Sequence, residues 1–121
     1  MKLLVCGDRN WTDRLIIKEY LEYLKPYLVI EGGARGADWI AGEVARELCI
    51  PVKEIMADWA SYGRAAGVIR NKWMLDEDPD LVLAFHHHIE ESKGTADMLT
   101  KTEKRGIPYI LVGIENQEEV I

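Results

Sequence analysis

Residues 28–38 read LVIEGGARGAD, and this stretch decides the fold of the 121-residue chain. Residues 28–30 form a short apolar run that predicts a buried strand. The glycine-rich residues 32–36 follow as a loop, and residues 37–48 then repeat apolar side chains at intervals of four, which predicts a helix. A strand that leads through a tight loop straight into a helix is the repeating unit of a parallel α/β sheet.

The same unit recurs along the chain. Strands are predicted at residues 2–6, 28–30, 52–56, 81–85 and 109–112, and helices at 12–24, 37–48, 65–76 and 95–105. This alternation predicts an α/β fold, a Rossmann-like three-layer sandwich with helices on both faces of a five-stranded parallel sheet in the order 3-2-1-4-5. Residues 58–64 are expected to form a loop, and the acidic residues 115–121 are expected to be frayed.

Length, charge and hydropathy restrict the class of protein. A chain of 121 residues, 48% of them apolar, is expected to form a single domain over residues 1–121. Its net charge of −6 argues against a general nucleic-acid binder, which normally presents a basic face. No signal segment and no apolar run of membrane-spanning length is recognisable, so we expect a soluble, cytoplasmic protein with no membrane partner.

Cations follow the predicted strands at one edge of the sheet. Arg9 lies in the loop after the first strand, Arg35 lies in the second loop, Arg64 precedes the third helix and Lys93 precedes the fourth. The carboxyl ends of parallel strands share one edge, and ligands bind there. Glycine lets a backbone approach a ligand, helix N-termini favour anions, and arginine grips phosphate. In an acidic chain this pattern predicts a pocket for an anionic ligand, most simply a nucleotide.

The residues predicted to contact the ligand lie in the strand-to-helix loops and on the third helix. They are Gly7, Asp8, Arg9, Trp11, Gly32, Gly33, Ala34, Arg35, Gly36, Asp38, Arg64, Arg70, Asn71, His86, Lys93, Gly94 and Thr95.

Several of these residues have a second interpretation. The glycine loop at residues 32–36 is also compatible with a tight turn that binds nothing, and Asp38 either stabilises the helix dipole or bonds a ribose hydroxyl. Trp11 and Trp59 at the ligand edge either stack a base or cap the core. Trp39 and Trp73, within helices, are expected to pack in the core or at a dimer interface.

Residues 86–88 read His-His-His and raise the question of a metal. On an extended backbone His86 and His88 share a face, which supplies two ligands. A site needs a third, and no further histidine or cysteine has the required spacing. We therefore expect no metal and no cofactor. No Ser-His-Asp or nucleophilic cysteine arrangement follows from the spacing either, so no catalytic residue is predicted.

The chain also resembles a known group of proteins. Residues 7–9 (GDR), residues 32–38 (GGARGAD), Gly67 with the Arg-Asn pair at 70–71, and the Gly-Thr pair at 94–95 are similar to motifs of the SLOG superfamily. This Rossmann-like group includes the DprA/Smf proteins and the LOG-type phosphoribohydrolases, and the chain particularly resembles small YpsA/YspA-related SLOG proteins of bacteria and phages. The resemblance implies a pocket for a nucleotide or nucleotide derivative, and a homodimer.

One motif departs from this pattern. LOG hydrolases carry a PGGxGTxxE motif whose Glu serves catalysis, whereas residues 91–98 here read ESKGTADM. Two glycines are missing and Met98 stands at the Glu position. Asp97 lies one residue away, which turns a helical side chain by about 100°. The departure favours binding without hydrolysis.

We therefore expect a protein that binds a nucleotide-derived ligand as a sensor, carrier or sequestering module. One alternative is a LOG-like hydrolase that cleaves an N-glycosidic bond. The other is a DprA-like partner of single-stranded DNA, against which the net acidity and the lack of a long basic stripe count.

Overall fold

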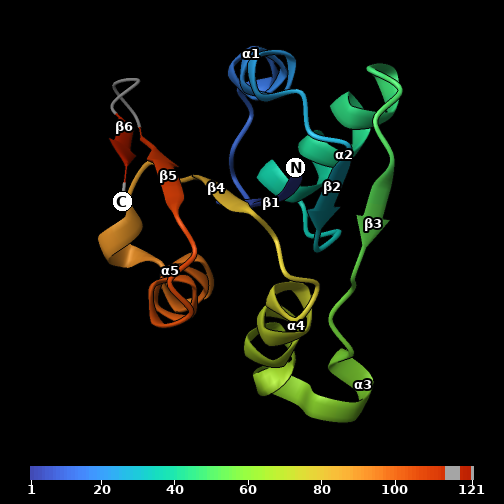
Figure 1. Ribbon diagram of the computed structural model, residues 1–121. Coiled ribbons are helices and arrows are strands. Elements are labelled where there is room, and N and C mark those ends of the chain that lie inside the picture. Colours follow the sequence, from blue (N-terminus) through green and yellow to red (C-terminus); the bar gives the residue numbers. More distant parts are fainter. Residues whose placement is uncertain (114–117, 121) are drawn as a thin grey trace.

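The computed structural model describes residues 1–113 and 118–120 and joins all the strands described into one sheet (Figure 1). The elements are β1 (Lys2–Gly7), α1 (Arg14–Leu24), β2 (Leu28–Glu31), α2 (Ala37–Glu47), β3 (Val52–Glu54), α3 (Trp59–Tyr62), η1 (Gly63–Ala65), α4 (Ala66–Leu75), β4 (Leu81–Phe85), η2 (Ile89–Glu91), α5 (Gly94–Lys104), β5 (Tyr109–Val112) and β6 (Glu118–Val120). The order is β3-β2-β1-β4-β5-β6, and β1 to β5 pair in parallel. The predicted five-stranded parallel sheet is confirmed.

The strand β6 is an addition to that prediction. It pairs antiparallel with β5, with Ile110 opposite Val120 and Val112 opposite Glu118. Without β6, β5 would present its unpaired N–H and C=O groups at the edge of the sheet. The expectation of a frayed terminus is therefore wrong for residues 118–120, while residues 115–117 and 121 lie outside the described part of the chain.

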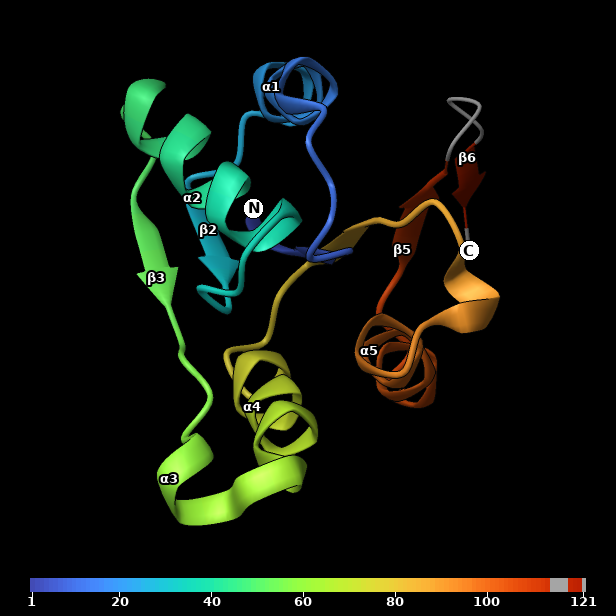
Figure 2. The ribbon, with the colours of Figure 1, turned by 180° about the vertical axis from the view of Figure 1, so that it is seen from behind.

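Helices cover both faces of the sheet. In Figure 1 α1 and α2 lie on one side of the strands and α4 and α5 on the other, and Figure 2 shows the same three layers from behind. Successive side chains of β1 alternate between the layers: Leu3 joins the buried cluster that contains Leu21 of α1, and Leu4 joins the cluster that contains Met98 of α5. Burial on both faces explains why the strands read as continuous apolar runs.

A short helix interrupts the segment expected to be a loop. The Asp58 side chain accepts a hydrogen bond from the backbone N–H of Ser61 at 3.1 Å and caps α3. The turn η1 then leads directly into α4. A helix of four residues is too short to show a hydrophobic period, which is why the sequence pattern missed it. None of the described helices is long and apolar enough to span a membrane.

Candidate functional site

The loops after β1 and β2 join into one surface at the carboxyl edge of the sheet. The backbone N–H of Ala37 donates to the Asp8 carbonyl at 3.1 Å, and the N–H of Asp8 donates to the Phe85 carbonyl at 2.8 Å. Gly36 has φ +85°, and a Cβ there would overlap the carbonyl oxygens of Asp8 and Arg9. Close contact between the two loops therefore explains the glycine at position 36.

An open groove with a volume of about 440 Å³ lies over this junction. Its lining residues come from the loop after β1, the loop after β2 and the first turn of α2: Arg9, Asn10, Trp11, Thr12, Arg35, Gly36, Trp39 and Ile40. Two loops far apart in sequence thus contribute one arginine each to the same groove.

Both groove arginines are available to a ligand. The side chains of Arg9 and Arg35 are exposed, and neither forms a hydrogen bond or ion pair with a described residue. The chain has enough carboxylates to pair with every cation, since it contains 21 Asp and Glu against 15 Lys and Arg. Other arginines are engaged: Arg14 with Glu43 and Glu47, Arg46 with Glu54, Arg70 with Gly32, and Arg105 with Asp76. Arg64 is also exposed and unpaired among the described residues, but it does not line the groove.

The glycine loop is organised around an internal carboxylate. Asp38 is buried, and its carboxylate accepts hydrogen bonds from the backbone N–H groups of Gly32, at 3.0 Å, and of Ala34. Burial raises the pKa of Asp38 to about 6, while the Arg70 guanidinium and these hydrogen bonds act in the opposite direction. The N–H groups of Gly32 and Ala34 therefore already bind a carboxylate of the protein itself, that of Asp38.

Two backbone N–H groups of the glycine loop are not used within the described fold. The N–H groups of Arg35 and Gly36 have no hydrogen-bond acceptor among residues 1–113 and 118–120. Both residues line the groove. An anion in the groove would meet the two guanidinium groups, whereas the Gly32 N–H already bonds Asp38.

Helix α4 braces this loop from the other layer. The Arg70 guanidinium donates to the Gly32 carbonyl at 2.7 Å, and a Cβ at Gly32 would overlap that guanidinium. The Asn71 side-chain amide donates to the Gly94 carbonyl and to the Asp97 carboxylate, both at 3.1 Å. Arg70 and Asn71 were predicted to contact the ligand. In the structure their side chains also tie the glycine loop and the start of α5 to α4.

Sequence reasoning missed Glu31, the last residue of β2. Its side chain is 1% exposed, and its carboxylate accepts the backbone N–H of Gly33 at 2.9 Å. Burial first, and then the nearby carboxylates of Asp38 and Glu54, raise the pKa of Glu31 to about 8. The available signal was a glutamate directly after the apolar run LVI in a strand predicted to be buried on both faces.

Of the remaining predicted residues, Trp11 lines the groove and the others do not. Trp11 is 3% exposed, and its ring stacks on His87 at a centroid distance of 4.3 Å, so the structure places it in the core. His86 is half-buried, which lowers its pKa, and its Nδ1 accepts the His88 N–H. Gly7 lies against the Phe85 carbonyl, and Gly33 against the Glu54 side chain.

At the start of α5, Thr95 is buried and donates its N–H to Ser92 Oγ at 3.0 Å. Lys93 and Gly94 are exposed, but they do not line the groove.

The position that differs from the LOG motif faces the interior. Met98 is buried in the cluster between the sheet and α5, away from solvent. The Asp97 carboxylate accepts hydrogen bonds from Asn71 and from the Lys101 ammonium, at 3.1 and 2.7 Å. Within the described part of the chain, no group of three or more His, Cys, Asp or Glu side chains is placed to hold a metal ion.

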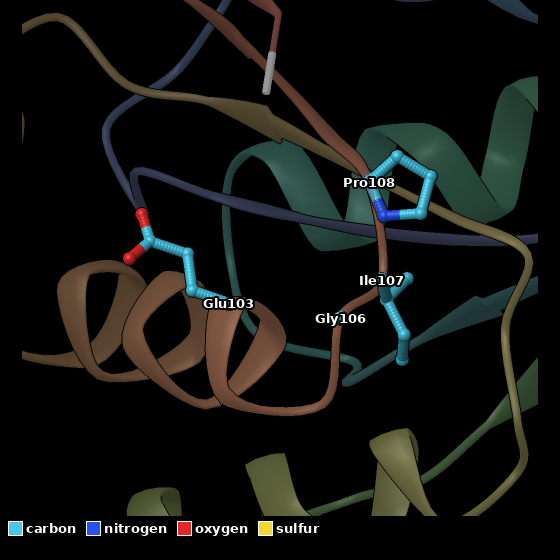
Figure 3. Close-up of a pocket in the computed structure, with 4 residues that line it drawn as sticks. All are labelled: Glu103, Gly106, Ile107 and Pro108. Carbon is cyan, nitrogen blue, oxygen red and sulfur yellow. The ribbon is translucent and has the colours of Figure 1, made fainter.

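A second depression, of about 490 Å³, lies where α5 turns into β5 (Figure 3). It is lined by Glu103, Gly106, Ile107 and Pro108. This turn precedes β5, so it lies at the amino edge of the parallel strands, opposite the groove. A lining of one carboxylate and apolar groups does not suit an anion.

Comparison with known proteins agrees with the motifs. Residues 1–62 match the model of the YspA, cpYpsA-related SLOG family. The chain is 34% identical over 122 residues to the Gene 61 protein of Mycobacterium phage D29, covering 93% of this chain and 96% of that protein. It is also similar to DNA processing protein A (DprA) from Streptococcus pneumoniae, with a TM-score of 0.74 and 12% identity over 91% of this chain.

The chain spans about half (49%) of that DprA chain, and the likeness at this identity concerns the fold alone. The family match and the phage relative confirm the resemblance seen in the sequence. The chain belongs to the YspA, cpYpsA-related SLOG family.

Proposed function

We propose that this protein binds a phosphate-bearing, nucleotide-derived ligand in the groove between the loops that follow β1 and β2. It would act as a sensor, carrier or sequestering module for that ligand. The observation that carries the proposal is the presence of two unpaired arginines, Arg9 and Arg35, from separate loops in one open groove. Membership of the SLOG family, whose domain is linked to nucleotide-derived ligands, supports the class of ligand.

The surroundings of the groove suit phosphate. Each arginine offers a planar fork of donors that matches the oxygens of a phosphate. The loop that carries Arg35 is held in place by Asp38, through the Gly32 N–H, and by Arg70, through the Gly32 carbonyl. A loop that is already ordered loses little conformational entropy on binding.

Binding without turnover is the version of this function that we favour. None of the described residues that line the groove is a carboxylate. These lining residues therefore offer no carboxylate to act as general acid or base in the cleavage of an N-glycosidic bond. Met98 is buried, and Asp97 is held by Asn71 and Lys101. These contacts count against the LOG-like alternative.

Calorimetric titration with nucleoside monophosphates tests the proposal. Arg35→Ala removes a charge-assisted contact and should weaken binding by roughly 10- to 150-fold. Arg64→Ala is the matched control, because Arg64 is also exposed and unpaired among the described residues but lies outside the groove. Equal affinity of the wild type and the folded Arg35→Ala variant would reject the assignment, as would the absence of any nucleotide binding by the wild type.

A further inference from the structure

Trp39 occupies an unusual place for a large apolar side chain. It lies in the first turn of α2, its backbone N–H donates to the Ala34 carbonyl at 3.0 Å, and its side chain is 55% exposed. It lines the groove together with Arg9 and Arg35. Its ring makes no aromatic contact with another described residue. The groove therefore offers a free indole surface beside two free cations.

The other tryptophans do not offer this surface. Trp11 also lines the groove, but it is buried and stacked on His87. Trp59 is 61% exposed, but it lies on α3, outside the groove. Trp73 is half-buried and packs edge-on against Tyr62. Trp39 is thus the tryptophan, among the described residues, that combines exposure with a place in the groove.

We infer that Trp39 stacks the aromatic base of the ligand, so that the groove favours phosphate-bearing ligands that carry a base. The inference rests on the proposed function, because it assumes that Arg9 and Arg35 hold the phosphate of the same molecule. It narrows the ligand class to molecules that carry both a phosphate and a planar base. Every base has a π-face, so stacking accepts all bases, and the larger purines gain more contact than pyrimidines.

The position of Trp39 also limits where another copy of the chain can bind. An interface that buried this tryptophan would cover the groove and with it the side chains of Arg9 and Arg35. Any homodimer compatible with ligand binding must therefore use a different surface, and the expectation that Trp39 serves a dimer interface conflicts with this role.

The test compares two probes, adenosine 5′-monophosphate and ribose 5-phosphate, which differ by the base. Trp39→Ala should weaken binding of the nucleotide by roughly 5- to 150-fold, the usual range for loss of one base stack. Binding of ribose 5-phosphate should not change. Trp39→Phe keeps an aromatic face and should retain most of the affinity, whereas Trp39→Leu keeps only apolar bulk and should not. Trp59→Ala is the matched control for removal of an exposed tryptophan.

The outcomes separate this inference from the function it rests on. If Arg35→Ala weakens nucleotide binding and Trp39→Ala does not, the phosphate site stands and the stacking role is overturned. If Trp39→Ala weakens the binding of both probes equally, the indole shapes the groove rather than stacking a base. This result also overturns the stacking role. If wild-type protein binds neither probe at millimolar concentration, both proposals fail. Circular dichroism and melting temperature show whether each variant is folded.

Discussion

Replacing Glu31 by Gln should stabilise the protein above neutral pH and flatten its dependence on pH. In the folded protein, burial and two neighbouring carboxylates raise the pKa of Glu31 from 4.5 to about 8. The unfolded chain therefore gives up this proton at a lower pH than the folded chain. The stabilising contribution of the protonated group is complete below pH 4.5, falls as the pH rises, and is lost above pH 8. Gln cannot ionise, and its carbonyl oxygen can still accept the Gly33 N–H.

The size of the effect follows from the two pKa values. Between them, each pH unit lowers the free energy of unfolding by about 1.4 kcal/mol. From pH 6 to pH 8 the free energy of unfolding falls by about 2 kcal/mol. This is a little less than twice the loss per pH unit, because half of the folded molecules have already ionised at pH 8. The raised pKa of Asp38, about 6, acts in the same direction and adds little above that pH.

Urea unfolding at pH 6 and pH 8 measures this difference, since urea adds no ionic strength. The wild type should lose about 2 kcal/mol between the two conditions, and Glu31→Gln should lose far less. Glu19→Gln makes the same chemical change on the exposed side of α1 and serves as the control. A wild type whose stability is level between pH 6 and pH 8, or a Glu31→Gln variant with the wild-type slope, would refute the reasoning.

Four further outcomes are expected. Arg70→Ala should cost about 1.5–3 kcal/mol of stability in urea unfolding, because it leaves the Gly32 carbonyl without its charged donor; unchanged stability would mean that water replaces the brace. Trp73→Ala should lower the melting temperature by several degrees without altering sedimentation, because the half-buried ring packs on Tyr62 at 5.9 Å; altered association would place it at an interface. We propose a homodimer, which should sediment at about twice 13.8 kDa at tens of micromolar, and a monomer with and without adenosine monophosphate would contradict it. Incubation with nucleoside monophosphates should release no free base by chromatography, and turnover that a groove substitution abolishes would restore the hydrolase alternative, with Asp97 tested first.

The sequence predicted the sheet and the edge of the sheet on which the groove lies. Strands buried on both faces read as apolar runs, and right-handed crossovers then determine the strand order. Arg9 and Arg35 follow from this, because a cation in the loop after a parallel strand must lie at the carboxyl edge. The short elements α3 and β6 could not be predicted in this way. The four residues of α3 are too few to show a helical period, and β6 reads Glu-Glu-Val, which is not an apolar run.

The sequence by itself determined which residues reach the carboxyl edge, and only the tertiary structure decided which of them face the groove. Arg35 and Asp38 lie three positions apart, yet one is exposed and the other is buried. Arg70 was predicted from its family motif, and only the structure shows that its guanidinium bonds a carbonyl 38 residues away. The direction of a loop or helix side chain depends on partners from distant parts of the chain, and local patterns carry no information about those partners. Periodicity predicts the edge of the sheet on which a residue lies, whereas packing decides whether its side chain lines the groove or bonds within the fold.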